Sequence, residues 1–242
     1  MTKVEAIKKV LEDNGGAASW KSIYDNIEKY YPTAKHSGEW EAGIRGVLYR
    51  EIRESRNFKK IGLAIFALKD YAEEKAPKKS DTVRMHSFIE GICLELGNFK
   101  NYNTYTADPS ATFKDHIKLF DLTTVKNIPN FTYTDIVSEA KRIDVIWFNK
   151  NGFQFPQKVF EVVDSIGTLT GAFNRSLQLL NFRTEFYIIA PEEHRNKFEK
   201  QINLEPYQSN AEKFKFANYN EMIELYDNAA KANKLESKIF QF

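Results

Sequence analysis

The sequence has few of the residues that several common types of protein site require. Its 242 residues include one cysteine and four histidines. Because Cys93 is the only cysteine, it cannot form an internal disulfide or a thiolate metal site. It lies in an apolar helical segment, so we expect it in the core. The histidines (His36, His86, His116 and His194) show no two-histidine metal spacing, and no His, Cys and Ser constellation is visible. Zinc and catalytic-triad chemistry are therefore not expected.

Long hydrophobic runs are also missing. No run approaches the roughly eighteen apolar residues of a membrane span. The start of the chain, Met1 to Glu5, lacks the apolar stretch of a secretory signal. We therefore expect a soluble intracellular protein with no membrane partner. A hydrophobic content of 42% and an aromatic content of 14% are sufficient for one large domain or two small ones.

Neither sign of charge dominates, since the net charge is +2. Residues 1–80 hold 16 Lys and Arg against 12 Asp and Glu, a net of +4, and residues 81–242 hold 19 against 21, a net of −2. The basic excess belongs to the N-terminal third. A polyanionic partner would therefore be expected to bind to this region first.

Two apolar runs, 142–148 and 159–164, are joined by the hydrophilic residues 149–152 and neighbours, which predicts a β-hairpin. Each predicted strand carries a carboxylate, Asp144 on the first and Glu161 on the second. Burying an unpaired charge in such a run is costly. A shared hard cation such as Mg²⁺ would remove that cost, and a salt-bridged or edge-facing pair is the alternative.

The first 72 residues show helical periodicity in three segments, followed by a β-hairpin pattern. The first helix begins after Thr2 and stops at Asn14. The second begins after Ser19 and ends before Pro32, and the third runs from after Ser37 to about Ser55. The hairpin covers residues 58–68, with its bend at Gly62 and Leu63. This order is typical of a winged helix, whose third helix normally enters the major groove of DNA.

The third predicted helix has two distinct faces. Its core face carries Trp40, Ile44, Val47, Leu48 and Ile52. The opposite face alternates cations with small residues, which lets a helix approach DNA. The expected DNA contacts are Lys35, Arg45, Tyr49, Arg50, Arg53, Lys59 and Lys60, with Ala42 and Gly46 between the cations. Protein contacts by a winged helix are the alternative.

Three stretches of this region resemble a known family. Ala6-Ile7 with Val10-Leu11, the run 20–24 and the closing run 60–68 look like the HARE-type winged helix of bacterial restriction enzymes and eukaryotic chromatin proteins. The resemblance implies a winged-helix DNA-binding domain at residues 1–72. A charged stretch containing Pro77 predicts a linker at 73–80, and a second domain would occupy 81–242.

The second domain is predicted to mix helices and strands, which makes the fold class α+β with a mixed central sheet. Residues 111–130 are ambiguous, and 115–122 are irregular or strand-like. The helix between the Glu161 strand and the Phe186 strand is a right-handed crossover, so these strands should be parallel. The expected helices cover 81–98, 133–141, 170–182, 192–201 and 218–234, and the expected strands 102–106, 142–148, 159–164, 184–190 and 213–217.

This order, with Asp144 seventeen residues before Glu161, resembles the PD-(D/E)XK nuclease core. The resemblance implies a type II restriction endonuclease that hydrolyses phosphodiester bonds of double-stranded DNA with Mg²⁺ or Mn²⁺, in the cytoplasm of a prokaryotic cell. Asp144 and Glu161 would be catalytic and would hold the metal. Glu90 on the opening helix would be a further catalytic acid, since helices of the family often lend one. Symmetric DNA sites are often met by two-fold dimers, so a homodimer is compatible with this role.

One position departs from the family pattern. The lysine expected two residues after Glu161 is Val163, and Asp164 should point to the opposite face because strand side chains alternate. A nearby polar side chain would then replace the lysine. The candidates are Gln178, Asn174 and Arg175 on the following helix, Lys158 beside the strand, and Asp164 if a bulge turns it inward; Asn174 and Arg175 are also expected DNA contacts, and Gln178 is the expected catalytic replacement.

Two competing functions remain open on the sequence. Val163 favours a DNA-binding protein whose nuclease-like domain has lost activity. A protein-interaction scaffold is the third interpretation, and it predicts no salt-sensitive DNA binding.

Overall fold

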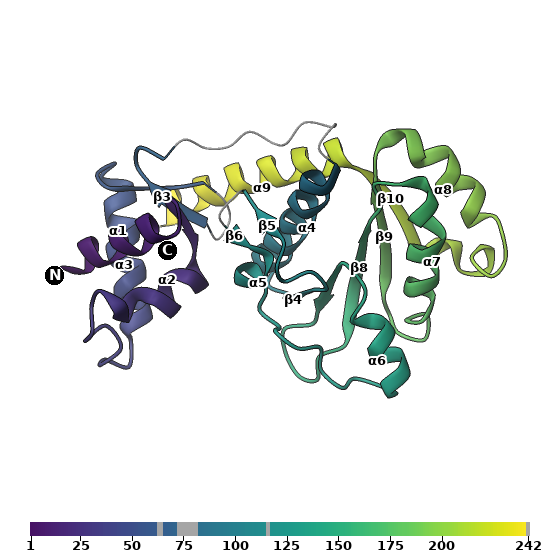
Figure 1. The fold of residues 1–242 in the computed structure, drawn as a ribbon, viewed down its shortest axis with the longest axis horizontal. Helices are drawn as coiled ribbons and strands as arrows, with labels where there is room; N and C mark the ends of the chain where they lie inside the picture. The colour runs from purple at the N-terminus through teal and green to yellow at the C-terminus, as the bar shows by residue number, and fades with distance from the viewer. Residues whose placement is uncertain (62–64, 72–81, 115–116, 241–242) are drawn as a thin grey trace.

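The computed structural model describes residues 1–61, 65–71, 82–114 and 117–240, coloured along the chain in Figure 1. An N-terminal unit ends with the strand Ile65–Leu68, and a larger C-terminal unit begins with the helix Thr82–Phe99. The expected α+β class with a mixed central sheet is confirmed. The predicted hairpin bend at Gly62 and Leu63 and the predicted linker at 73–80 lie outside the described residues.

The N-terminal unit contains the three predicted helices and one strand that the sequence did not reveal. Thr2 forms a capping box with Glu5 at the first helix, and Ser19 caps the second. The additional strand, β1, consists of Ala17–Ser19 and pairs antiparallel with the last strand of the unit, β3. The order of strands in this sheet is β1-β3-β2. The elements are α1 (Lys3–Asp13), β1 (Ala17–Ser19), α2 (Trp20–Asn26), η1 (Ile27–Lys29), α3 (Trp40–Arg53), β2 (Phe58–Lys60) and β3 (Ile65–Leu68).

The N-terminal sheet is buried on both faces. Along β3, Phe66 packs among the helices of its own unit, while Ile65 and Ala67 belong to a hydrophobic cluster of the C-terminal unit. This alternation follows from the two-residue period of a strand. The two units therefore share apolar contacts through the sheet.

The C-terminal unit is built on a sheet of order β10-β9-β8-β7-β4. β7 runs antiparallel to both of its neighbours, β4 and β8, whereas β8, β9 and β10 run parallel to one another. The parallel pairing of β8 and β9 is the one predicted from the crossover. The elements are α4 (Thr82–Phe99), β4 (Asn103–Thr106), β5 (Thr112–Phe113), β6 (Ile117–Lys118), α5 (Leu119–Leu122), α6 (Thr134–Ala140), β7 (Val145–Phe148), β8 (Pro156–Val162), η2 (Ile166–Thr168), α7 (Leu169–Leu177), β9 (Glu185–Ala190), η3 (Glu192–His194), α8 (Arg195–Ile202), η4 (Gln208–Lys213), β10 (Phe214–Asn218) and α9 (Tyr219–Phe240).

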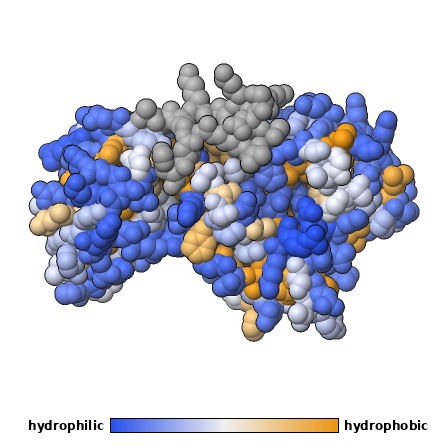
Figure 2. All heavy atoms as spheres, viewed as in Figure 1, coloured by the Kyte–Doolittle hydropathy of each residue, from blue (hydrophilic) through white to orange (hydrophobic). Residues whose placement is uncertain are grey.

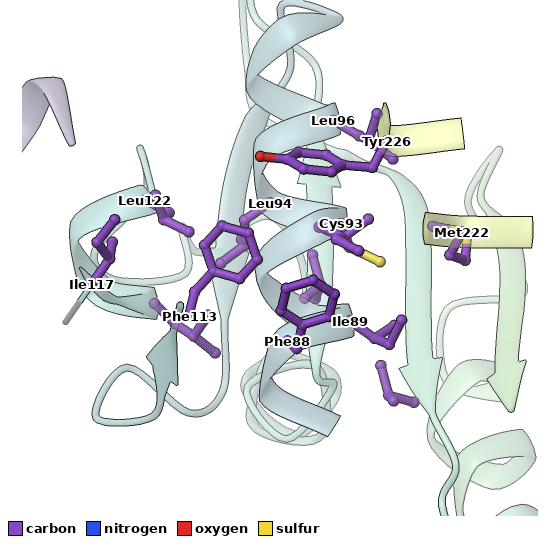
Figure 3. Close-up of a cluster of buried hydrophobic side chains, with 14 of the residues drawn as sticks. Phe88, Ile89, Cys93, Leu94, Leu96, Phe113, Ile117, Leu122, Met222 and Tyr226 are labelled. Atoms are coloured by element: carbon purple, nitrogen blue, oxygen red, sulfur yellow. The ribbon is translucent and has the colours of Figure 1, made fainter. Parts of the chain in front are cut away.

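Helices cover both faces of this sheet. α4 and α9 cover one face, and Figure 3 shows their side chains meeting around Cys93, which is buried as expected. α6, α7 and α8 pack on the other face. α4 approaches the sheet closely, because a Cβ added at Gly97 would lie 2.5 Å from Thr104 and 2.6 Å from the Trp147 ring nitrogen. Trp147 Nε1 donates a hydrogen bond to the Cys93 carbonyl at 3.0 Å.

Several predicted boundaries were wrong. The ambiguous segment 115–122 contributes β6 and the short α5. The helix predicted at 133–141 begins at Thr134, after the N-cap residue Tyr133, which makes no side-chain capping hydrogen bond. α7 stops at Leu177, earlier than predicted, and β7 begins at Val145, so Asp144 precedes the strand. In the structure, backbone pairing and tertiary packing determine where these elements begin and end. Residue preferences carry no information about those partners, so they locate the ends less accurately.

The molecule is elongated, and the last helix of the C-terminal unit, α9, runs from the large sheet back to the N-terminal unit (Figure 1). The face drawn in Figure 2 is largely hydrophilic, and its lower outline is hollowed between the units. Within the described ranges, no helix combines the length and apolar character needed to cross a membrane.

Candidate active site

The two predicted acids lie side by side at the end of the β7–β8 ladder. Val145 pairs with Phe160, which places Asp144, immediately before β7, next to Glu161 on β8. The backbone N–H of Val162 donates to Asp144 Oδ2 at 2.7 Å and fixes that side chain. Burial raises the pKa of Asp144, against the charge of His86 and the hydrogen bond from Val162.

Glu161 is fully buried and is held by Arg175 of α7. Arg175 Nε donates to Glu161 Oε1 at 2.8 Å, and Nη2 donates to the other carboxylate oxygen. Burial raises the pKa of Glu161 to about 8, although this hydrogen bonding opposes the shift, and the charge of Asp144 raises it further. Of the candidates for the missing lysine, Arg175 is therefore the one in direct contact with Glu161.

His86 of α4 lies among three further carboxylates. Its Nδ1 is 3.0 Å from Asp164 Oδ2, and its Nε2 is 3.8 Å from Glu90 Oε1 and 3.9 Å from Asp144 Oδ2. Burial opposes protonation of the ring, but the hydrogen bond to Asp164 and the neighbouring charges outweigh it and raise the pKa of His86 to about 9. Tyr219 at the start of α9 donates its hydroxyl to the other oxygen of Asp164. Burial and that contact raise the pKa of Tyr219.

Glu90 follows His86 by one helical turn and is 1% exposed. Its Oε2 is buried and has no hydrogen-bond partner among the residues that the structure describes. Burial and the charge of Asp144 raise the pKa of Glu90 well above its usual range. His86, Glu90 and Asp144 each offer one ligand atom, and these atoms all lie within 4.8 Å of one another, so this group is able to hold a metal ion.

The other candidates for the missing lysine lie apart from Glu161. Lys158 donates to Glu185 at 2.5 Å. Gln178 is exposed, with its amide 3.4 Å from the Asn174 carbonyl, and the Asn174 side chain accepts from a tyrosine hydroxyl at 2.7 Å. Asp164 lies beyond the end of β8 and contacts α4 and α9, the opposite side from Glu161, as strand alternation predicts.

The cationic face of α3 is displayed as expected. Arg45, Arg50 and Arg53 are exposed, Tyr49 is half-buried, and the core-face residues Ile44 and Leu48 are buried. Lys35, before the helix, is paired with Glu28 at 2.8 Å and lies 5.2 Å from the centre of the Trp40 ring. Their role as DNA contacts stays a prediction.

Lys59 and Lys60 of β2 make contacts within the chain. Lys59 Nζ donates to the carbonyl of Tyr71 at 2.6 Å, and Lys60 donates to the side chain of Asn233 on α9. Burial lowers the pKa of Lys60. The two lysines were expected to contact DNA, and in the structure both contact other parts of the chain. Their role as DNA contacts stays a prediction.

Sequence reasoning missed His86 and Tyr219. The four-residue spacing of His86 and Glu90 on an amphipathic helix was the available signal, because such pairs share one helix face. Tyr219 gave no signal, since 55 residues separate it from Asp164.

A surface hollow of about 460 Å³ lined by Lys8, Arg56 and Tyr71 lies on the N-terminal unit, away from these carboxylates.

The model of one protein family matches most of the chain. The family is the type II restriction enzyme NmeDI C-terminal domain, and the match covers residues 68–241. The chain belongs to this family. No curated protein and no solved structure matches it.

Every residue of the carboxylate cluster lies inside the part that matches the NmeDI C-terminal domain family. Membership in a family of type II restriction enzymes indicates restriction endonuclease activity, for which DNA is the substrate. The α3 face lies in residues 1–67, outside the matched span.

Proposed function

We propose that this protein is a metal-dependent endonuclease that hydrolyses phosphodiester bonds of double-stranded DNA as a type II restriction enzyme. One observation carries the proposal. Asp144 and Glu161 meet at the end of the β7–β8 ladder, beside the buried Glu90, in the region that matches the restriction-enzyme family. Such an enzyme would act in the cytoplasm of a prokaryotic cell.

The order of elements supports a PD-(D/E)XK core. A helix (α4) is followed by the antiparallel strands β4, β7 and β8, a crossover helix (α7) and the parallel strand β9. Asp144 immediately precedes the second of these strands and Glu161 lies on the third, close to where the motif acids of that fold are expected. The homodimer expected of an enzyme at symmetric sites is part of the proposal.

The residues present fit Mg²⁺ or Mn²⁺. Hard divalent cations are held by carboxylate oxygens, and Glu90 Oε2 is buried with no hydrogen-bond partner among the described residues. Asp144, Glu161 and Glu90 would hold the cation, with Asp144 the central ligand because it adjoins both of the others. A bound divalent cation lowers the pKa of a water molecule and offsets charge on the phosphate.

Arg175 takes the place of the missing lysine in this proposal. It holds both oxygens of Glu161 and thereby fixes the orientation of that carboxylate. Its side chain is 24% exposed, so the guanidinium remains accessible to an arriving phosphate. A guanidinium keeps its charge at all working pH values and binds phosphate oxygens through two donors.

The N-terminal unit would bind the duplex as a winged helix. The helix α3 carries Arg45, Arg50 and Arg53 on its exposed face, and such a face suits a DNA groove or backbone. Tyr49 and Lys35 flank this row. Since Lys59 and Lys60 are engaged within the chain, the helix would make the principal contacts.

Plasmid cleavage tests the proposal. Wild-type protein with Mg²⁺ should cut plasmid DNA, whereas Asp144→Asn and Glu161→Gln should leave it intact. Glu199→Gln, which changes an exposed acid on α8, is the matched control and should cut normally. Equal cutting by all four proteins would contradict the assignment of the acids.

A DNA-binding protein without nuclease activity is the second candidate. The observation in its favour is Val163, which is 2% exposed and packs in the apolar cluster under α7. Salt-sensitive binding of duplex DNA by wild-type protein, with no cutting in Mg²⁺ or Mn²⁺ on methylated or unmethylated plasmid, would select this candidate.

A further inference from the structure

His86 is held in one orientation by two residues outside the acid pair. Asp164 lies 3.0 Å from Nδ1, and Tyr219 donates to the other Asp164 oxygen. With the Nδ1 proton shared with Asp164 Oδ2, the ring in its neutral form has its lone pair on Nε2. That nitrogen faces Glu90 and Asp144.

The spacing around Nε2 is too wide for hydrogen bonds. Its separations of 3.8 Å from Glu90 Oε1 and 3.9 Å from Asp144 Oδ2 exceed the usual donor–acceptor distances of about 2.7–3.2 Å. Ligand atoms about 2.1 Å from a shared ion lie about 3.0 Å apart when adjacent and about 4.2 Å apart when opposite. The two separations lie between these values, and all three atoms lie within 4.8 Å of one another, so they are close enough to converge on one cation.

Two further observations point to a ligand at this position. Glu90 is 1% exposed, and its second oxygen lacks a hydrogen-bond partner in the described part of the chain. In metal sites, a coordinating histidine almost always donates its other ring N–H to a carboxylate, as His86 does to Asp164. The arrangement thus supplies both the ligand atoms and the group that orients one of them.

We propose that His86 Nε2 coordinates the divalent cation of this site together with Asp144 and Glu90, and that Asp164 and Tyr219 are positioning residues for the ring. This inference rests on the nuclease proposed above and adds His86 to the donor set of Asp144, Glu161 and Glu90. An imidazole ligand favours transition ions over hard ones, so the site should bind Mn²⁺ more tightly than Mg²⁺ or Ca²⁺.

A purely structural role for His86 is the alternative. The raised pKa of His86 means that the metal-free ring carries a proton, which would offset the charges of Asp144, Glu90 and Asp164 and which a bound cation would have to displace. A protonated ring has no lone pair for a metal, so the two roles differ in whether nitrogen is bonded to the cation. This difference is measurable without any turnover.

The experiment uses full-length protein freed of metal by a chelator and then given Mn²⁺ alone. Pulsed electron paramagnetic resonance should detect a directly coordinated nitrogen in the wild type. His86→Gln should abolish that nitrogen signal and weaken Mn²⁺ binding by at least about 10-fold, while reducing the preference for Mn²⁺ over Mg²⁺. His36→Gln, at an exposed position in the N-terminal unit, is the matched control and should retain both.

Variants of the positioning residues should weaken Mn²⁺ binding but keep the nitrogen signal. Tyr219→Phe removes only the hydroxyl that contacts Asp164, so it should keep the nitrogen signal and weaken Mn²⁺ binding by less than His86→Gln. Asp164→Asn should keep the signal and weaken binding by about 10–100-fold, as loss of an orienting carboxylate does elsewhere. Wild-type affinity in both variants would contradict their role.

The outcomes separate this inference from the nuclease itself. Wild-type protein that cuts DNA and binds Mn²⁺ without a nitrogen signal overturns the inference and leaves the nuclease standing. A nitrogen signal in a protein that cuts no DNA supports the inference and overturns the nuclease. Absence of Mn²⁺ binding overturns the proposed site. If His86→Gln fails to fold in circular dichroism, the wild-type spectrum alone still decides whether nitrogen is bound.

Discussion

The residue that most affects the interpretation of the site is Arg175. The lysine expected beside Glu161 would have come from the strand itself, at the position of Val163. That position is packed in the apolar cluster between β8 and α7. The cation that contacts Glu161 is Arg175 of α7, which covers the same face of the sheet. In the proposed function this guanidinium takes the place of the strand lysine.

Loss of Arg175 should therefore be costly. In Arg175→Met, the buried Glu161 carboxylate loses both of its hydrogen bonds, and we expect the free energy of unfolding to fall by about 3 kcal/mol. Urea unfolding followed by circular dichroism measures the change. Arg142→Met breaks an exposed pair with Glu139 and should cost about 0.5 kcal/mol or less. Equal effects of the two substitutions would mean that Arg175 does not stabilise Glu161.

Among the elements, α3 contains an unexplained glycine. Gly46 lies in mid-helix, is exposed, and has no atom within 4 Å of an added Cβ. Glycine in a helix interior costs about 0.5–1 kcal/mol relative to alanine. Nothing within the described chain requires a glycine here, whereas close approach of DNA to the row of arginines would.

Substitutions at Gly46 separate stability from binding. Gly46→Ala should raise the free energy of unfolding by about 0.5–1 kcal/mol. Gly46→Leu should not destabilise the protein, but it should weaken duplex DNA binding several-fold in fluorescence anisotropy, because the side chain would meet the groove. Asn228→Leu, at an exposed position of α9, is the control and should bind normally. Unchanged binding by Gly46→Leu would remove α3 from the interface.

The parallel pairing of β8 and β9 also contains a charge pair. Lys158 is in register with Glu185 and donates to it at 2.5 Å. Hydrogen bonds from Lys158 and Tyr187 lower the pKa of Glu185 to about 2. The folded state thus favours the ionised form of Glu185, so this contribution to stability is complete above the unfolded pKa near 4.5 and is lost as the pH falls towards 2.

Lys158→Met tests this dependence. At pH 7 the substitution should lower the free energy of unfolding by less than about 1 kcal/mol, because the Glu185 side chain is 42% exposed. The difference from wild type should shrink between about pH 4.5 and pH 2. Thermal unfolding across that range gives the result, with Lys200→Met as an exposed control. A difference that persists unchanged at pH 2 would assign the effect to packing.

At the scale of the whole molecule, the small N-terminal sheet joins the two units. Ile65 is fully buried in the cluster that includes α4 and α9 of the larger unit. Polar contacts add to this interface: Ser19 donates to the Asp121 carbonyl at 3.4 Å, and Lys114 donates to the Ile61 carbonyl at 3.2 Å. The orientation of α3 relative to the acid cluster is therefore set by packing.

This shared cluster predicts cooperative unfolding. Scanning calorimetry should show a single transition for the wild type, and Ile65→Ala should cost about 2–4 kcal/mol through the cavity that it leaves. Ile239→Ala, at a 59% exposed position of α9, should have little effect. Two separate wild-type transitions, of which Ile65→Ala shifts only one, would show that the units unfold independently.

The sequence by itself determined the elements whose signals are local. Helical periodicity identified α1, α2 and α3, and Thr2 and Ser19 cap the first two as expected. The hydrophilic residues 149–152 between two apolar runs identified the hairpin beside which Asp144 and Glu161 lie. The crossover rule gave the parallel pairing of β8 and β9. These features depend on residues close together in the chain, or on handedness shared by all proteins, so one sequence is enough to find them.

Tertiary structure alone decided which side chains surround the acids. Arg175 reaches Glu161 from 14 residues away, His86 reaches Asp164 from 78, and Tyr219 reaches Asp164 from 55. The same packing half-buries Lys59 and Lys60 and engages them in contacts within the chain, which the sequence did not reveal. Such contacts depend on how helices are seated on a sheet, which is fixed by the summed packing of many residues and leaves no pattern in any local stretch.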